Sequence, residues 1–268
     1  MRKRTRLSRR FTVVVIALGF ACVVGASSPA YASAIALSSI IASDLTVTAQ
    51  TGVIAFDPAF TQAFASAQNS LGDVDANVDG SPSDPATASA AVTWAAGSAS
   101  SGGTQWSAQS GVNIPGFTDG AASSQGQALW SSTFTITCPE NTTCSPTTNV
   151  NFGTLIDWNL SVFTQEAGLF AFAQATFNLL LDGETVLFWS SPLSIGPNDA
   201  MSDTSSDFLL TNSVALAYGT PYSLFLRVDA ESNAANIPEV PEPATLTLLS
   251  VGGLITMVRV RRTRLVRR

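Results

Sequence analysis

Residues 169–190 read LFAFAQATFNLLLDGETVLFWS, in which two apolar runs are separated by Asp182-Gly183. Asp-Gly between two such runs is the strongest short-range signal for a β-hairpin, because a two-residue turn needs positive φ angles that these residues tolerate. The stretch therefore predicts two adjacent antiparallel strands.

The rest of the central region also favours strands, since alternation is frequent and helical periodicity is scarce. Residues 150–163 read as a strand pair or one long bent strand. A turn is expected at Tyr218-Gly219-Thr220-Pro221. Further predicted elements are strands within 87–99, 128–137, 207–216 and 221–229, a short helix around 59–67 and a loop at 71–85. Strands of this number and spacing predict an all-β fold over residues 33–230, an antiparallel β-sandwich of jelly-roll-like type.

Charge is distributed unevenly along the 268 residues. Of the 13 Lys and Arg residues, six lie within residues 2–10 and six within 259–268, and only Arg227 lies between these clusters. Each cluster borders an uncharged apolar run, at 11–26 and 244–258. Basic segments beside apolar spans stay in the cytoplasm, so the acidic region between them is expected to be exported.

The first 32 residues have the three parts of a secretory signal peptide, with a predicted signal helix. Ala30-Tyr31-Ala32 fits the small-x-small pattern of signal peptidase, which places cleavage after Ala32. An uncleaved membrane anchor is the alternative. A lipoprotein signal at Cys22 fits poorly because bulky Phe20 stands where a small residue is expected.

The C-terminal segment combines three features in a fixed order. Pro241-Glu242-Pro243 is followed by the apolar run 244–258 and then by arginines. As a helix, these fifteen residues would span about 22 Å, which is short for a permanent membrane anchor. With Val240 in front, residues 241–268 resemble the PEP-CTERM sorting signal, and 231–240 reads as a linker.

The PEP-CTERM resemblance implies recognition and processing by exosortase, a membrane protease-transpeptidase. It also implies a Gram-negative-type envelope and an association with exopolysaccharide. The alternative is an ordinary C-terminal transmembrane helix over 244–258, which predicts the same topology without processing.

Two local motifs are candidate sites. Cys138 and Cys144 in CPENTTC form an even pair in an exported region and are expected to be a disulfide. Asp73, Asp75, Asn77 and Asp79 precede Gly80 and resemble the first half of a calcium-binding loop. Ala86 replaces the bidentate Glu of that loop, so a solvated acidic turn is the alternative reading.

Residue types that are absent restrict the chemistry. The chain has no His, which excludes Ser-His-Asp catalysis and His-bound zinc. Arg227 alone in an acidic region argues against nucleic-acid binding. Paired-carboxylate glycosidase chemistry stays open, with candidates Asp157, Glu166, Asp182 and Glu184. Five Trp residues could form a sugar-stacking platform, although most Trp residues in a β-sandwich belong to the core, which is the expected place for each of these five. Trp106, in a polar context, is the first candidate for exposure.

These observations predict a non-enzymatic protein of the envelope or extracellular matrix, with an inner-membrane intermediate. Its expected role is structural or adhesive within surface polysaccharide or biofilm. A carbohydrate-binding module and a carboxylate-based glycan-active enzyme are the alternatives. No cofactor is expected apart from calcium, and the expected partners are signal peptidase, exosortase, the membrane and exopolysaccharide.

Overall fold

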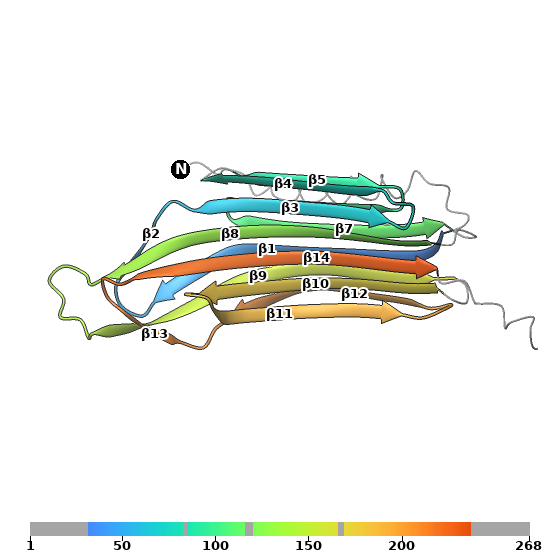
Figure 1. Cartoon of the computed structure of the whole chain (residues 1–268). Helices are drawn as coiled ribbons and strands as arrows, with labels where there is room; N and C mark the ends of the chain where they lie inside the picture. The colour runs from blue at the N-terminus through green and yellow to red at the C-terminus, as the bar shows by residue number, and fades with distance from the viewer. Residues whose placement is uncertain (1–31, 83–84, 116–119, 166–168, 237–268) are drawn as a thin grey trace, which may run out of the picture. The chain divides into compact units, whose positions relative to one another are not determined.

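The fold consists of two seven-stranded antiparallel sheets that share one apolar core (Figure 1). A computed structural model describes residues 32–82, 85–115, 120–165 and 169–236. The predicted all-β sandwich is confirmed. No helix in these described ranges could cross a membrane, and the predicted signal and transmembrane helices lie outside them.

The two sheets alternate along the chain, so consecutive strands often belong to opposite layers. Sheet A contains, in spatial order, β12 (Ala200–Leu210), β9 (Thr147–Thr164), β1 (Ala32–Ala49), β7 (Gln105–Pro115), β6 (Ala95–Gly102) and β5 (Ala86–Val92), with β13 (Val214–Ala217) also on β9. Sheet B contains β11 (Glu184–Ile195), β10 (Leu169–Leu181), β14 (Pro221–Asn236), β8 (Gly120–Thr137), β3 (Phe60–Asn69) and β4 (Val74–Pro82), with β2 (Val53–Phe56) also on β8.

The Asp-Gly hairpin is confirmed between β10 and β11. Leu181 pairs with Glu184 across the turn, and Asp182 and Gly183 have φ angles of 50° and 87°. Positive φ at both central residues matches the right-handed twist of the flanking strands. The predicted turn at Tyr218–Pro221 is also confirmed, since it joins β13 to β14.

Three predicted elements are wrong. The helix expected around 59–67 is strand β3, in which Ala63, Ala65 and Ala67 face the core. The loop expected at 71–85 contains strand β4. The linker expected from residue 231 begins no earlier than 237, because β14 continues to Asn236. In β3 and β14 small residues at alternate positions form a buried strand face that composition alone does not reveal, whereas β4 is an exposed edge strand paired with β3.

Side chains of the core change in size along the strands. Large apolar residues fill the part near the β8–β9 connection, including Phe134, Ile136, Phe152, Leu224 and Leu226. Further along the same strands the inward positions hold small residues. On β10 the buried series runs Leu181, Leu179, Phe177, Ala175, Ala173, Ala171, and on β14 it runs Leu224, Leu226, Val228, Ala230, Ser232, Ala234.

Where small residues face each other, the backbones of the two sheets are in contact. A Cβ atom added to Gly126 of β8 would lie 2.6 Å from the carbonyl oxygen of Gln109 on β7. One added to Gly97 of β6 would lie 2.9 Å from the carbonyl oxygen of Ser66 on β3. Sandwich backbones ordinarily stand about 10 Å apart, so this region has no room for side chains beyond those present.

Buried serines bridge the two sheets in this region. Ser110 of β7 donates to the carbonyl of Ser124 on β8 (2.8 Å), and Ser124 Oγ accepts from the amide of Gly111 (3.0 Å). Ser232 of β14 donates to the carbonyl of Ser110 (3.2 Å). Ser38 of β1 donates to the carbonyl of Gln174 on β10 (2.6 Å). Each hydroxyl thereby satisfies its own hydrogen-bonding need inside the core.

The substitution Gly126→Ala should force the sheets apart and lower the free energy of unfolding by about 1–3 kcal/mol, the usual cost of overpacking. Gly196→Ala is the control, because a Cβ there meets nothing within 4 Å. Chemical denaturation of both variants measures the difference. Equal stability of the two variants would contradict backbone contact between the sheets.

Candidate functional site

Most predicted sorting residues lie outside the described ranges. Ala30 and Pro241-Glu242-Pro243 are among them, and Ala32 is the first residue of β1. Cleavage at Ala32 and processing near the PEP motif therefore stay predictions.

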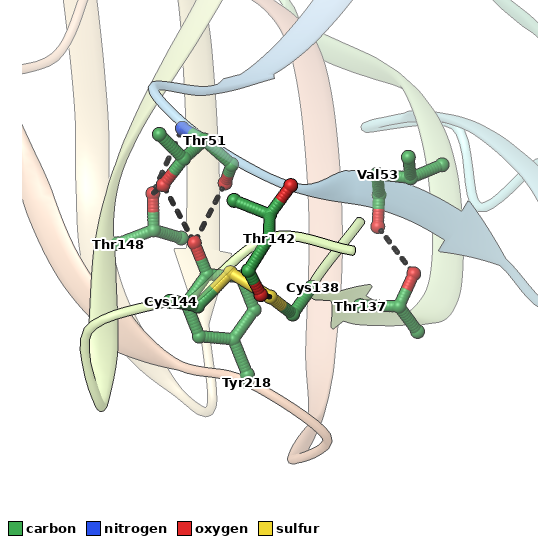
Figure 2. Close-up of a disulfide and its surroundings, with 8 residues drawn as sticks. All are labelled: Thr51, Val53, Thr137, Cys138, Thr142, Cys144, Thr148 and Tyr218. Carbon is green, nitrogen blue, oxygen red and sulfur yellow. Dashed lines mark hydrogen bonds between the residues drawn. A yellow bond between two sulfur atoms is a disulfide. The ribbon is translucent and has the colours of Figure 1, made fainter. Parts of the chain in front are cut away.

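The predicted disulfide is confirmed. Cys138 and Cys144 are bonded, with Cα atoms 6.1 Å apart (Figure 2). Asn141, at φ 63°, and a hydrogen bond from the Thr142 amide to the Pro139 carbonyl (3.3 Å) form the turn between them. Since β8 belongs to sheet B and β9 to sheet A, the bridge closes one of the connections between the two sheets.

A hydroxyl cluster beside the disulfide ties the β1–β2 and β13–β14 connections to the start of β9. The Tyr218 hydroxyl lies 2.6 Å from Thr51 Oγ1 and donates to the Thr51 carbonyl (3.1 Å). Thr148 Oγ1 accepts from the Thr51 amide (3.1 Å). Figure 2 shows these side chains converging next to the disulfide. Gly52 has φ 107°, and a Cβ there would lie 2.9 Å from both Ile136 and Tyr218, so glycine is required.

Removing the disulfide should have a modest effect. For so short a loop, the chain-entropy model gives a loss of about 2 kcal/mol. We expect reductant to lower the thermal midpoint of the native protein. The thermal midpoint of the C138S/C144S double variant, which has no disulfide to reduce, should stay the same. A midpoint that does not respond to reductant in the native protein would show that the bridge adds no stability.

Strand β4 presents the proposed calcium ligands to the neighbouring sheet. Asp75, Asn77 and Asp79 pair with inward-facing alanines of β3 and so share one face. The Asp75 carboxylate accepts a hydrogen bond from the Ala91 amide of β5 (2.8 Å), and Asp79 accepts from the Thr87 amide (2.9 Å). These amides lie along the outer edge of sheet A, so the aspartates fasten one sheet edge to the other.

The expected loop conformation at this motif is wrong. An extended strand spaces alternate side chains about 6.7 Å apart, whereas a calcium loop curls them around one ion. Asp73 lies before the strand and accepts from Asn69 Nδ2 (2.8 Å). No group of three or more acidic, Cys or His side chains suited to a metal occurs in the described ranges. Calcium binding by these residues stays an untested prediction.

Loss of the two aspartates should weaken this edge. D75A/D79A removes two charge-assisted acceptors and should lower the free energy of unfolding by about 2 kcal/mol, given about 1 kcal/mol per net hydrogen bond. N77A is the matched control, since no hydrogen bond of its side chain occurs in the described residues. Thermal denaturation in EDTA and in calcium distinguishes metal binding from the edge contact. If the two aspartates bind calcium, the double variant should lose stability only when calcium is present; if they make the edge contact, it should lose stability in EDTA as well.

Tryptophan side chains do not form an exposed platform. Trp106, the first candidate for exposure, belongs to the core as expected for most tryptophans, because it is 2% exposed and packs against Trp130 with ring centroids 5.8 Å apart. Trp158 and Trp189 pack at 4.5 Å, and Trp94 is half-buried. The Trp158 indole donates to Asp203 (2.9 Å), which also accepts from Ser191 (2.9 Å) of the other sheet. The tryptophans thus contribute to packing.

The carboxylates considered for glycosidase chemistry are not gathered in a pocket within the described ranges. Asp157 lies on β9 of sheet A, whereas Asp182 and Glu184 flank the hairpin turn of sheet B. Asp182 accepts a hydrogen bond from the Ser223 amide (2.8 Å) and so supports the turn. Glu166 lies outside the described residues.

The outer face of sheet B carries two adjacent hollows that sequence reasoning missed. They measure about 350 and 290 Å³ and share Gln125 and Glu231. The register places Gln174, Glu231, Gln125 and Ser66 in one row across β10, β14, β8 and β3, strands that lie side by side in Figure 1. We call the two hollows together the polar trough.

Some side chains of the polar trough are held in place and others are free. Asp229 accepts from Gln127 Nε2 (2.7 Å) and from Arg227 Nε (2.6 Å). Glu231 accepts from Asn233 Nδ2 (2.8 Å). Within the described residues, the side chain of Gln125 has no hydrogen-bond partner, although it lies between the two hollows.

Neither a protein-family model nor a curated protein matches the chain.

Proposed function

We propose that the chain is an exported envelope or extracellular protein that signal peptidase and exosortase process. The observation that carries this proposal is the order of basic, apolar and PEP segments around an acidic region. The Cys138–Cys144 disulfide supports it, because such bonds persist in oxidising compartments. In this proposal, residues 244–258 hold a membrane intermediate before the protein reaches the surface.

The proposed role of residues 32–236 is structural or adhesive, within surface polysaccharide or biofilm matrix. A sandwich with a disulfide and with rows of polar side chains across its outer faces supports that role. We also propose a jelly-roll class for the eight central strands. Their order, β7-β1-β9-β12 against β8-β14-β10-β11, supports it, since most successive strands of this set cross between the layers.

Nucleic acid is not a proposed partner. Arg227, the one basic residue of the central region, is paired with Asp229, and a phosphate backbone requires several unpaired cations. We propose no enzymatic role. The carbohydrate-binding alternative is favoured by the polar trough rather than by tryptophans.

Intact mass of the protein from its native host, with and without exosortase, tests the sorting proposal. We expect a mature form that starts near Ser33 and ends near Pro241, and that this form disappears in the exosortase-deficient strain. A form that keeps Arg259–Arg268 in both strains would identify an ordinary membrane anchor and overturn the proposal.

A further inference from the structure

The polar trough has the composition of a surface that binds hydroxyl-rich ligands. Its central row supplies amide, carboxylate and hydroxyl groups from Gln174, Glu231, Gln125 and Ser66. Four strands spaced about 4.8 Å apart make the row about 14 Å long. These groups both donate and accept hydrogen bonds, as sugar hydroxyls require.

We propose that the polar trough binds a neutral glycan chain, lying across β10, β14, β8 and β3. The inference rests on the proposed adhesive role and names the partner of that role. It assigns hydrogen bonding to the free Gln125 amide and to the ordered carboxylates Asp229 and Glu231.

The net negative charge of the trough favours neutral ligands over anionic ones. The trough contains Asp229 and Glu231, and its single cation, Arg227, already pairs with Asp229 at 2.6 Å. An anionic polysaccharide, a phosphate or a nucleic acid would meet net negative charge without a free cation to offset it. A neutral glycan meets only polar groups, and carboxylates accept hydrogen bonds from its hydroxyls.

Hydrogen bonds within the trough reduce the entropy lost on binding. Gln127 and Arg227 fix Asp229 from two sides, and Asn233 fixes Glu231. Gln174 donates to Ser190 of β11 (3.0 Å), which fixes its orientation as well. Side chains that are ordered before a ligand arrives cost less to immobilise.

Exposed aromatic rings border the trough and suit the apolar faces of sugars. Phe188 is 62% exposed and lies beside Asn178 in the register. Phe170 is 41% exposed, on β10 beyond Gln174. The outer face of sheet A also carries exposed rings, Phe163 and Phe208. Its central row, Thr204, Asn159, Ser39, Gln109 and Ser98, contains no carboxylate, whereas the central row of the trough contains Glu231.

Calorimetric titration of the full-length protein tests the proposal. A zwitterionic detergent should be used, because sugar headgroups would compete. The probes are neutral hexasaccharides of glucose, mannose and galactose, with hexagalacturonate as the anionic comparison. We expect at least one neutral hexasaccharide to bind with a Kd between about 10 μM and 1 mM, near −4 to −7 kcal/mol, and hexagalacturonate to bind at least tenfold more weakly.

Matched variants locate the binding surface. Gln125→Ala should weaken the neutral interaction about tenfold, whereas Gln109→Ala, the same change on the outer face of sheet A, should leave it unchanged. Glu231→Gln should reduce the discrimination against hexagalacturonate. Thermal midpoints of all three variants establish that they remain folded.

Absence of binding by every neutral hexasaccharide would overturn the proposal, as would equal affinities of Q125A and Q109A. Tighter binding of hexagalacturonate than of any neutral probe would also overturn it. If binding fails while exosortase-dependent processing is intact, the trough assignment alone is wrong. If processing fails while binding is intact, the sorting proposal alone is wrong.

Discussion

Contact between the backbones of the two sheets is the constraint on which the rest of the structure depends. Gly97 and Gly126 face carbonyl oxygens of the opposite sheet, and a single Cβ at either position would collide with them. This closeness requires alanine, serine and glycine at the neighbouring inward positions, which explains the composition of the region. It also brings the hydroxyls of Ser38, Ser110 and Ser232 within reach of backbone carbonyls across the interface.

Small residues bury little apolar area each, so this half of the core gains less from the hydrophobic effect than the half that contains Phe134, Phe152 and Phe177. Polar contacts at the margins offset that weakness. Asp75 and Asp79 join the sheet edges on one side, and Asp203 joins them on the other. The disulfide closes the connection beside the large residues. Edge strands fastened in this way are also less available for pairing with other chains.

Local signals in the sequence predicted the features that depend on neighbouring residues. The Asp182-Gly183 hairpin and the Cys138–Cys144 bridge are of this kind, since each is defined within a few residues. Strand β4 was missed because its D-x-N-x-D pattern fits either a calcium loop or a strand with one acidic face, and only the position of β5 distinguishes them. The polar neighbours of Trp106 made it the first candidate for exposure among the tryptophans, although alternation in β7 turns it inward. The polar trough could not be found because its central row comes from four strands whose register is set by tertiary packing.

The trough lies over the most closely packed part of the core, and this position links packing to binding. Gln125 stands between Ser124 and Gly126, both of which contact sheet A. Glu231 stands between buried Ala230 and Ser232. Because neighbours along a strand point to opposite faces, the inward residues fix the backbone while the outward residues remain free to contact a ligand. A backbone held on its inner side by an opposing sheet cannot shift easily, so the spacing of the outward groups is set before a ligand arrives. Such fixed spacing lowers the entropy lost when weak polar contacts form with sugar hydroxyls, and it thereby raises the affinity of the trough.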